Sequence, residues 1–136
     1  MNKKIYLICS VRHATEEQKE FADNYVAYLE KIGCKVHYPP RDVDQTDDGT
    51  GTSICEAHRK AMIECDEVHT IWDSSSTGSH FDLGMAYVLQ ELHGIKIRCV
   101  NNPEKTDHKS YTNFLLELER REHMKDIVKE EINYDR

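Results

Sequence analysis

A hydroxyl-rich segment followed by a single carboxylate is the part of this chain best suited to chemistry. Residues 74–79 contain four serines and a threonine, and Asp82 follows in what we expect to be the first turn of a helix. A helix N-terminus favours anions because its N–H groups are free and its dipole is positive there. An ionised Asp82 in this setting could attack or stabilise an electron-poor sugar carbon. The structural alternative is a helix cap, because Ser79 and Asp82 have the spacing of a variant capping box.

Two further positions could bind an anion. Ser10 and Arg12 follow the first apolar run, and the planar guanidinium of an arginine can contact a phosphate or a carboxylate through two hydrogen bonds. Ser76 and Ser79 would add hydroxyl donors to the same anion site. The alternatives are an N-cap and a surface salt bridge for Ser10 and Arg12, and a solvated loop for the serines.

Three other residues complete the candidate site. His58 lies in the middle of an expected helix and could act as an acid or base, although a histidine there more often packs or faces solvent. Asp73 ends an apolar run and could bind ribose hydroxyls or cap the loop that follows. Tyr6 could present its ring to a nucleobase, or it could pack in the core.

Strands and helices alternate along the chain and must position these residues. Continuous apolar runs indicate strands buried on both faces, at 5–11, 35–38, 67–72 and 95–100. Helical periodicity indicates helices at 15–32, 53–65, 79–92 and from 111 onward.

Local signals mark where these elements begin and end. The pairs Thr15 with Gln18 and Ser53 with Glu56 have the spacing of capping boxes at two helix starts. The two prolines at 39–40 should end the second strand. The polar, acidic segment that follows them is expected to be a long loop.

This alternation predicts an α/β fold with a mostly parallel sheet of four to five strands and helices on both faces. Residues 1–120 would form this single domain, and 121–136 a charged C-terminal helical extension that could pack on a partner. Ligands of such folds bind beyond the carboxyl ends of the strands, where the strand order reverses. Ser10, Asp73 and the serine-rich loop are expected at that edge.

Composition excludes several classes of function. The 136 residues carry a net charge of -7, which argues against nucleic-acid polymers and anionic membranes but not against a small phosphorylated ligand. We found no apolar run long enough to span a bilayer and no signal peptide, so a cytoplasmic protein is expected. Five cysteines without a C-x-x-C pair favour free thiols, and the eight histidines lack zinc-site spacing. Because nucleotide-binding glycine motifs are also missing, we expect neither a metal nor a cofactor.

Residues 4–100 resemble the nucleoside 2-deoxyribosyltransferase superfamily, which includes the deoxynucleoside 5′-monophosphate N-glycosidases. The resemblance is carried by three segments, Ile5-Tyr6-Leu7-Ile8-Cys9-Ser10-Val11-Arg12, Cys65-Asp66-Glu67-Val68 and Ser76-Thr77-Gly78-Ser79-His80-Phe81-Asp82-Leu83-Gly84-Met85-Ala86. The last segment looks like the loop and ELG-x-A helix start of that family, with Asp82 in place of the glutamate. The resemblance implies a single-domain flavodoxin-like (Rossmann-like) fold, usually dimeric or larger, in which a neighbouring subunit often completes the pocket.

The same resemblance implies cleavage of the N-glycosidic bond of a nucleoside or nucleoside 5′-monophosphate. Asp82 would be the nucleophile, and a glycosyl-enzyme would be resolved by water or by a second base. Ser10, Arg12 and Ser76 would match phosphate-binding positions, and Tyr6 a substrate-lining position. His58 stands where the family commonly has a carboxylate. The alternative is a nucleotide-binding module on the same fold that does not turn its ligand over.

Overall fold

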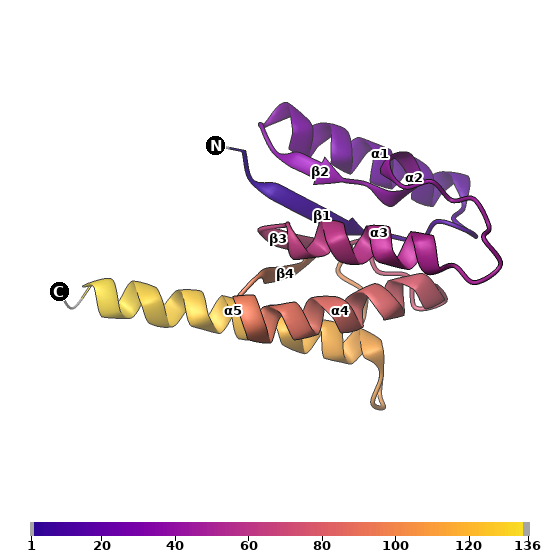
Figure 1. Cartoon of the computed structure of the whole chain (residues 1–136). Coiled ribbons are helices and arrows are strands. Elements are labelled where there is room, and N and C mark those ends of the chain that lie inside the picture. The colour runs from indigo at the N-terminus through magenta and orange to yellow at the C-terminus, as the bar shows by residue number, and fades with distance from the viewer. Residues whose placement is uncertain (1, 135–136) are drawn as a thin grey trace.

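The computed structural model describes residues 2–134, which form one parallel sheet and five helices (Figure 1). In chain order the elements are β1 (Lys4–Ile8), α1 (Glu16–Lys31), β2 (Lys35–His37), α2 (Pro39–Asp42), α3 (Thr52–Ile63), β3 (Glu67–Thr70), α4 (Thr77–His93), β4 (Lys96–Cys99) and α5 (Tyr111–Tyr134). All pairs of neighbouring strands are parallel, and the strand order is β2-β1-β3-β4. This is the flavodoxin-like order without a fifth strand, so the predicted α/β fold class is confirmed.

Alternate residues of each strand enter two separate cores. On β1, Ile5 and Leu7 pack against α1, whereas Tyr6 and Ile8 pack on the opposite face with α3, α4 and α5. Because side chains alternate across a strand, the two faces carry different residue sets from the same short segment. Figure 1 shows α1 on one side of the sheet and α3 with α4 on the other. Helices therefore cover both faces, as predicted.

Helix α5 covers the open edge of β4. The backbone N–H of Cys99 donates to the carboxylate of Glu119, and Lys96 forms an ion pair with Asp126 at 3.7 Å. Covering an edge strand in this way blocks pairing with another chain. The predicted extension 121–136 continues α5 without a break as far as Tyr134, and residues 135–136 lie outside the described residues. Its C-terminal half projects away from the sheet (Figure 1).

Several predicted element ends were wrong for identifiable reasons. The first strand ends at Ile8 rather than at residue 11. The second strand ends before the two prolines at 39–40, as predicted. The prolines begin the short helix α2 where a loop was expected to follow, since proline is accepted in a first helical turn, where its missing N–H costs nothing. The box from Thr15 and Gln18 is present at α1.

The predicted capping box from Ser53 and Glu56 does not form. Helix α3 begins at Thr52 after Gly51, which adopts a left-handed φ of 76° and has no side chain to cap with. The carboxylate of Asp48 accepts the backbone N–H groups of Gly51 and Ser53 instead. A loop aspartate therefore satisfies free N–H groups at the start of α3 in place of the expected serine.

Within residues 2–134, none of the helices is both long and apolar enough to cross a membrane.

Candidate active site

Asp82 is buried, and both of its carboxylate oxygens are engaged. The Tyr6 hydroxyl donates to Oδ2 at 2.9 Å, and Nδ1 of His58 lies 3.2 Å from Oδ1. These partners come from β1 and α3, so three elements distant in sequence fix one carboxylate. Asp82 is 4% exposed. Asp82 and His58, predicted separately from the sequence, are therefore direct neighbours.

The predicted start of α4 was wrong, and this changes the position of Asp82 in the helix. The helix begins at Thr77 and is capped by Ser76, whose hydroxyl accepts the backbone N–H of Ser79 at 3.2 Å. Asp82 consequently lies in the second turn, where helix N–H groups already have partners. The capping-box alternative for Ser79 and Asp82 is thereby excluded, because Asp82 bonds to Tyr6 and His58 and not to a helix terminus.

Tyr6 lies between two histidines. Its ring stacks on His37 with centroids 5.2 Å apart and meets His58 edge-on at 6.0 Å. Burial, and then the Asp82 charge, raise the pKa of the Tyr6 hydroxyl, which therefore stays protonated as a donor. The ring is completely buried, so it offers no open face to a nucleobase here. Tyr6 holds Asp82 and is not among the residues that line the cavity at the strand ends.

Polar atoms near this carboxylate keep unused hydrogen-bonding capacity. Among the described residues, Nε2 of His58, Nε2 of His37 and Oγ of Ser79 are enclosed and have no partner. Ser79 lies one helical turn before Asp82 and so shares its helix face. No Lys or Arg within residues 2–134 forms an ion pair with Asp82. A buried carboxylate without a lysine or arginine partner, beside unpaired polar atoms, is typical of a functional site.

A cavity of about 580 Å³ opens at the carboxyl ends of β1 and β3. These strands flank the position where the strand order reverses, which is where ligands bind in such folds. The wall contains Ser10 and Asp73, as predicted, together with Trp72 and Asn101. Neither Asp82 nor His58 lies on this wall. Cys9 links the two regions, since it lines the cavity and the Asp82 charge, after burial, raises the pKa of its thiol to about 12.

Asp73 is an acceptor at the mouth of this cavity. Ser75 donates to it through its hydroxyl at 2.6 Å and through its backbone N–H at 2.9 Å, and the Gln18 amide lies 3.4 Å away. The hydrogen bond from the Ser75 side chain is the main reason that the pKa of Asp73 is lowered, with a smaller contribution from Ser10. Asp73 therefore carries a negative charge at neutral pH.

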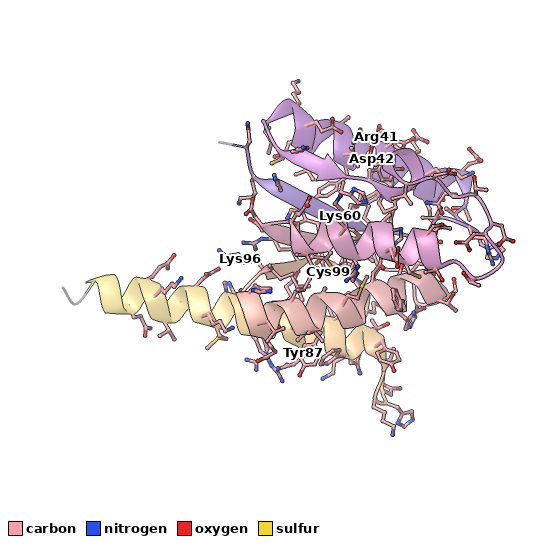
Figure 2. The ribbon with its side chains drawn as sticks, in the orientation of Figure 1. Arg41, Asp42, Lys60, Tyr87, Lys96 and Cys99 are labelled. Carbon is pink, nitrogen blue, oxygen red and sulfur yellow. The ribbon has the colours of Figure 1, made fainter. Side chains whose placement is uncertain are left out.

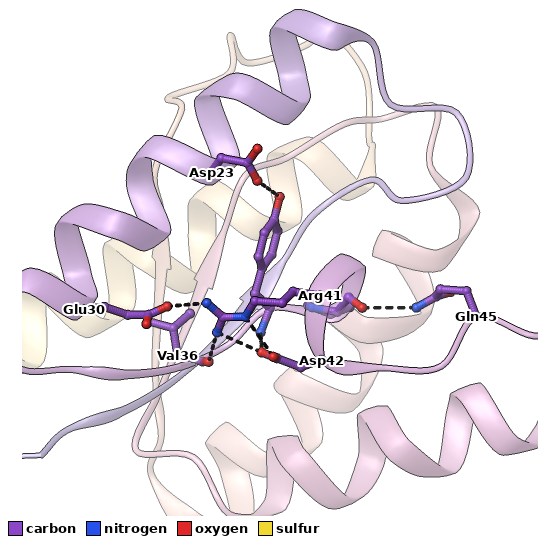
Figure 3. A network of polar contacts seen from close by, with 8 residues as sticks. Asp23, Glu30, Val36, Arg41, Asp42 and Gln45 are labelled. Carbon is purple, nitrogen blue, oxygen red and sulfur yellow. Dashed lines mark hydrogen bonds and ion pairs between the residues drawn. The ribbon is translucent and has the colours of Figure 1, made fainter.

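Helix α2 lines the same cavity, and hydrogen bonds and ion pairs of Arg41 hold this helix in place (Figure 3). The guanidinium of Arg41 contacts Glu30 at 2.5 Å, Asp42 at 2.8 Å and the carbonyl of Val36 at 3.1 Å. Arg41 and Asp42 are the last two residues of α2 and lie well away from Tyr87 on α4 (Figure 2). With its charge used in these ion pairs, Arg41 anchors the wall and is not a free anion site.

The two other expected anion-binding residues lie outside the cavity. Arg12 is exposed and has no hydrogen-bond or ion-pair partner among residues 2–134. Ser76 is occupied as the cap of α4. The structure thus divides the predicted residues into a buried group with Asp82, a cavity pair of Ser10 and Asp73, and these two.

His37 is the residue that sequence reasoning missed. It stands at the end of the second strand and pairs in register with Tyr6 across the β1–β2 ladder. The signal that could have found it is parallel alignment of the first two strands, which places their end residues side by side. A run of only three strand residues was too short to fix that register.

Comparisons with known proteins identify the fold. Neither a protein-family model nor a curated protein sequence matches the chain. Solved structures do match, and two of them are described here. The CMP N-glycosidase of Clostridium botulinum is 19% identical, with a TM-score of 0.58, over 85% of this chain and 82% of that one. The 2-deoxyribosyltransferase of Bacillus psychrosaccharolyticus is 18% identical, with a TM-score of 0.61, over 82% of this chain and 90% of that one. The chain therefore has the fold of these two enzymes, as the resemblance of residues 4–100 implied.

Proposed function

We propose that this protein cleaves the N-glycosidic bond of a nucleoside or a nucleoside 5′-monophosphate, with Asp82 as the nucleophile. The observation that carries the proposal is the Asp82 carboxylate, held by Tyr6 and His58 and paired with no lysine or arginine in residues 2–134. Such a carboxylate keeps its charge available for an oxocarbenium-like transition state. The fold and the family motif around Asp82 support the same chemistry.

The proposed reaction has two steps. An Asp82 oxygen bonds to the anomeric carbon while the bond from that carbon to the base nitrogen breaks, and the base leaves with the electron pair. Water, or a second base, then attacks the anomeric carbon and releases Asp82. Transfer and hydrolysis thus share the first step.

His58 is the proposed acid for the leaving base. An ionised carboxylate can only accept hydrogen bonds, so Nδ1 of His58 must donate to Asp82. In the imidazolium form Nε2 carries a second proton, and Nε2 has no partner among the described residues. That proton can pass to the departing base nitrogen, and water can restore it in the second step.

The cavity is the proposed place for the 5′ side of the sugar, and the site must open beside Cys9 for the anomeric carbon to reach Asp82. Carboxylates such as Asp73 accept hydrogen bonds from sugar hydroxyls, and Ser10 lies on the same wall. The exposed Arg12 and the hydroxyl of Ser76 are the proposed contacts of a 5′-phosphate. Closure around such a ligand requires the Arg12 side chain to turn toward the cavity.

One observation favours a second candidate function, a binding module that does not turn its ligand over. Asp82 is 4% exposed and both oxygens have partners, so substrate must reach a carboxylate that is closed off in this state. Tight binding without release of free base would support this alternative.

We also propose a homodimer or larger assembly. Helix α4 exposes Phe81, Val88 and Leu92, which lie on one helix face. An exposed apolar stripe of this kind fits a second protein surface. Light scattering of the purified protein measures the assembly mass directly.

The proposed function is tested by release of free base. The purified protein is incubated with a panel of ribo- and deoxynucleosides and their 5′-monophosphates, and the products are separated by chromatography. We expect one base class to be released by the wild type and not by Asp82→Asn. Equal release by Asp82→Asn would overturn the role of Asp82, and no release with a monophosphate raising the Tm would favour the binding module.

A further inference from the structure

His37 brings a second imidazole to the Asp82 site. It is Cα partner to Tyr6 in the parallel register of β1 and β2, so both side chains lie on the same face of the sheet. Its ring is stacked on Tyr6 with an interplanar angle of 22°, and Tyr6 in turn donates to Asp82. The two imidazoles of His37 and His58 therefore flank the one phenol that holds the carboxylate.

The Nε2 atom of His37 is enclosed and has no hydrogen-bond partner among the described residues. A buried nitrogen without a partner costs stability, and a phenylalanine could make the same ring stack without that cost. Packing on Tyr6 therefore does not explain a histidine here. An enclosed polar atom beside a catalytic carboxylate is explained by a partner that arrives with the substrate.

We infer that Nε2 of His37 hydrogen-bonds the nucleobase that the substrate carries, and so helps to select and orient it for departure. This inference rests on the proposed function. His58, through its contact with Asp82, is placed to give the proton, whereas His37 contacts the base without taking part in bond cleavage. The ligand class is a heterocyclic base with ring nitrogens and exocyclic groups that pair with an imidazole.

The charges around His37 suit this role. Burial lowers its pKa, and the charged or titratable groups that act on it are Asp42, Asp82, His58 and Arg41. The two carboxylates oppose the effect of burial, while His58 and Arg41 add to it. A neutral imidazole can donate or accept toward a base without placing a second cation beside Asp82.

The first test compares His37→Phe with a matched control, His123→Phe, at an exposed histidine of α5. Phenylalanine keeps the stack on Tyr6 and removes both nitrogens. We expect kcat/KM for base release to fall about 10-fold or more, the loss of roughly one hydrogen bond, with the Tm unchanged or raised. Wild-type kcat and KM in His37→Phe would overturn the inference, whereas His123→Phe should match the wild type.

The second test needs no turnover. Protein with ¹⁵N-labelled histidine is titrated with free adenine and with free cytosine, and the His37 Nε2 resonance is followed by NMR. We expect one base to shift this resonance, and we expect His37→Phe to bind that base at least about 10-fold more weakly. If neither base shifts it, the inference is wrong even where base release is observed. A shift without base release would uphold the inference and remove the proposed chemistry.

Discussion

Two buried carboxylates lie on opposite faces of the same sheet, and they are satisfied in different ways. Glu67 begins β3 and faces α1, whereas Asp82 of α4 meets the face that carries Tyr6. Each has a histidine within hydrogen-bond distance and a tyrosine in its cluster. Only Glu67 is paired with cations that carry a permanent charge, Lys3 and Arg98.

The Glu67 cluster is complete. Lys3 lies 2.5 Å from Oε2, while Arg98 at 3.1 Å and His69 at 3.2 Å contact Oε1. The other nitrogen of His69 lies 2.6 Å from the Tyr25 hydroxyl. Burial would raise the pKa of Glu67, but the hydrogen bonds from Lys3, His69 and Arg98 outweigh it and lower the pKa to about 2. The Glu67 carboxylate, both ring nitrogens of His69 and the Tyr25 hydroxyl therefore all have partners within the fold.

The difference separates a structural ion cluster from a candidate site. A carboxylate neutralised by two cations has no charge left to stabilise a transition state. The Asp82 carboxylate has no lysine or arginine partner among residues 2–134, and the Nε2 atoms of His37 and His58 near it are unused. Both carboxylates are buried, so burial does not distinguish them. Within the described part of the chain they differ because lysine and arginine pair with Glu67 alone, and because unused polar atoms lie only near Asp82.

The largest expected effect is on activity. Asp82→Asn should lower kcat on the order of 10³-fold or more, because an amide cannot form the ester to the sugar. Glu67→Gln should change kcat by less than about 2-fold, since Glu67 lies on the other face. Steady-state base release by both variants measures the contrast, and comparable losses would remove the distinction between the two carboxylates.

The two tyrosines provide the next contrast. Tyr6→Phe leaves an Asp82 oxygen without its donor and should lower kcat/KM about 10- to 100-fold. Tyr25→Phe removes only a bond to His69 and should leave activity unchanged while lowering stability by about 1 kcal/mol. Steady-state kinetics and thermal unfolding are measured for both variants. A larger loss of kcat/KM in Tyr25→Phe than in Tyr6→Phe would contradict the assignment of the active site to the Asp82 group.

Acid stability should depend on Glu67. Its pKa is about 2 when folded against an ordinary value of 4.5, so its stabilisation is complete above about pH 4.5 and is lost as the pH falls toward 2. Glu67→Gln should lower the unfolding free energy at pH 7 by about 1–2 kcal/mol and flatten its decline between pH 4.5 and 2. Urea unfolding across this pH range measures both, and an unchanged acid slope would show that Glu67 is not the group responsible.

The smallest effect concerns a single cation of the cluster. The Arg98 side chain is 48% exposed, and Lys3 still neutralises Glu67 when Arg98 is removed. Arg98→Gln should therefore cost only about 0.5 kcal/mol, less at high salt. Urea unfolding at low and high ionic strength checks this, and a loss of several kcal/mol would mean that the cluster depends on one arginine.

The arrangement of strands and helices could be predicted from the sequence because it follows from the periodicity of apolar residues. Apolar runs alternating with helical patterns indicated a parallel sheet covered on both faces, and the box at Thr15 and Gln18 formed as expected. Asp73 and Ser10 reached the strand-end cavity because a parallel sheet brings its strand ends to one edge. These features depend on patterns that are local in sequence.

The caps of α3 and α4 and the strand register could not be predicted, because contacts between distant residues determine them. Several serines precede α4, and each could cap it. Ser79 is buried and Asp82 is bonded to Tyr6, so the cap is Ser76. Asp48 displaced the expected cap at α3 because a loop conformation brought its carboxylate to the helix terminus. The position of His37 required strand register, which three residues do not specify.

The most direct test of the central claim is to identify the carboxylate that bonds to the sugar. The wild-type protein is quenched in acid during turnover of its best nucleoside or nucleotide, and peptides are mapped by mass spectrometry, with Glu67→Gln and Asp82→Asn alongside. We expect the mass of the glycosyl group on the peptide containing Asp82, in the wild type and in Glu67→Gln but not in Asp82→Asn. A glycosyl group on another residue, with Asp82→Asn still forming it, would contradict the claim that Asp82 is the nucleophile.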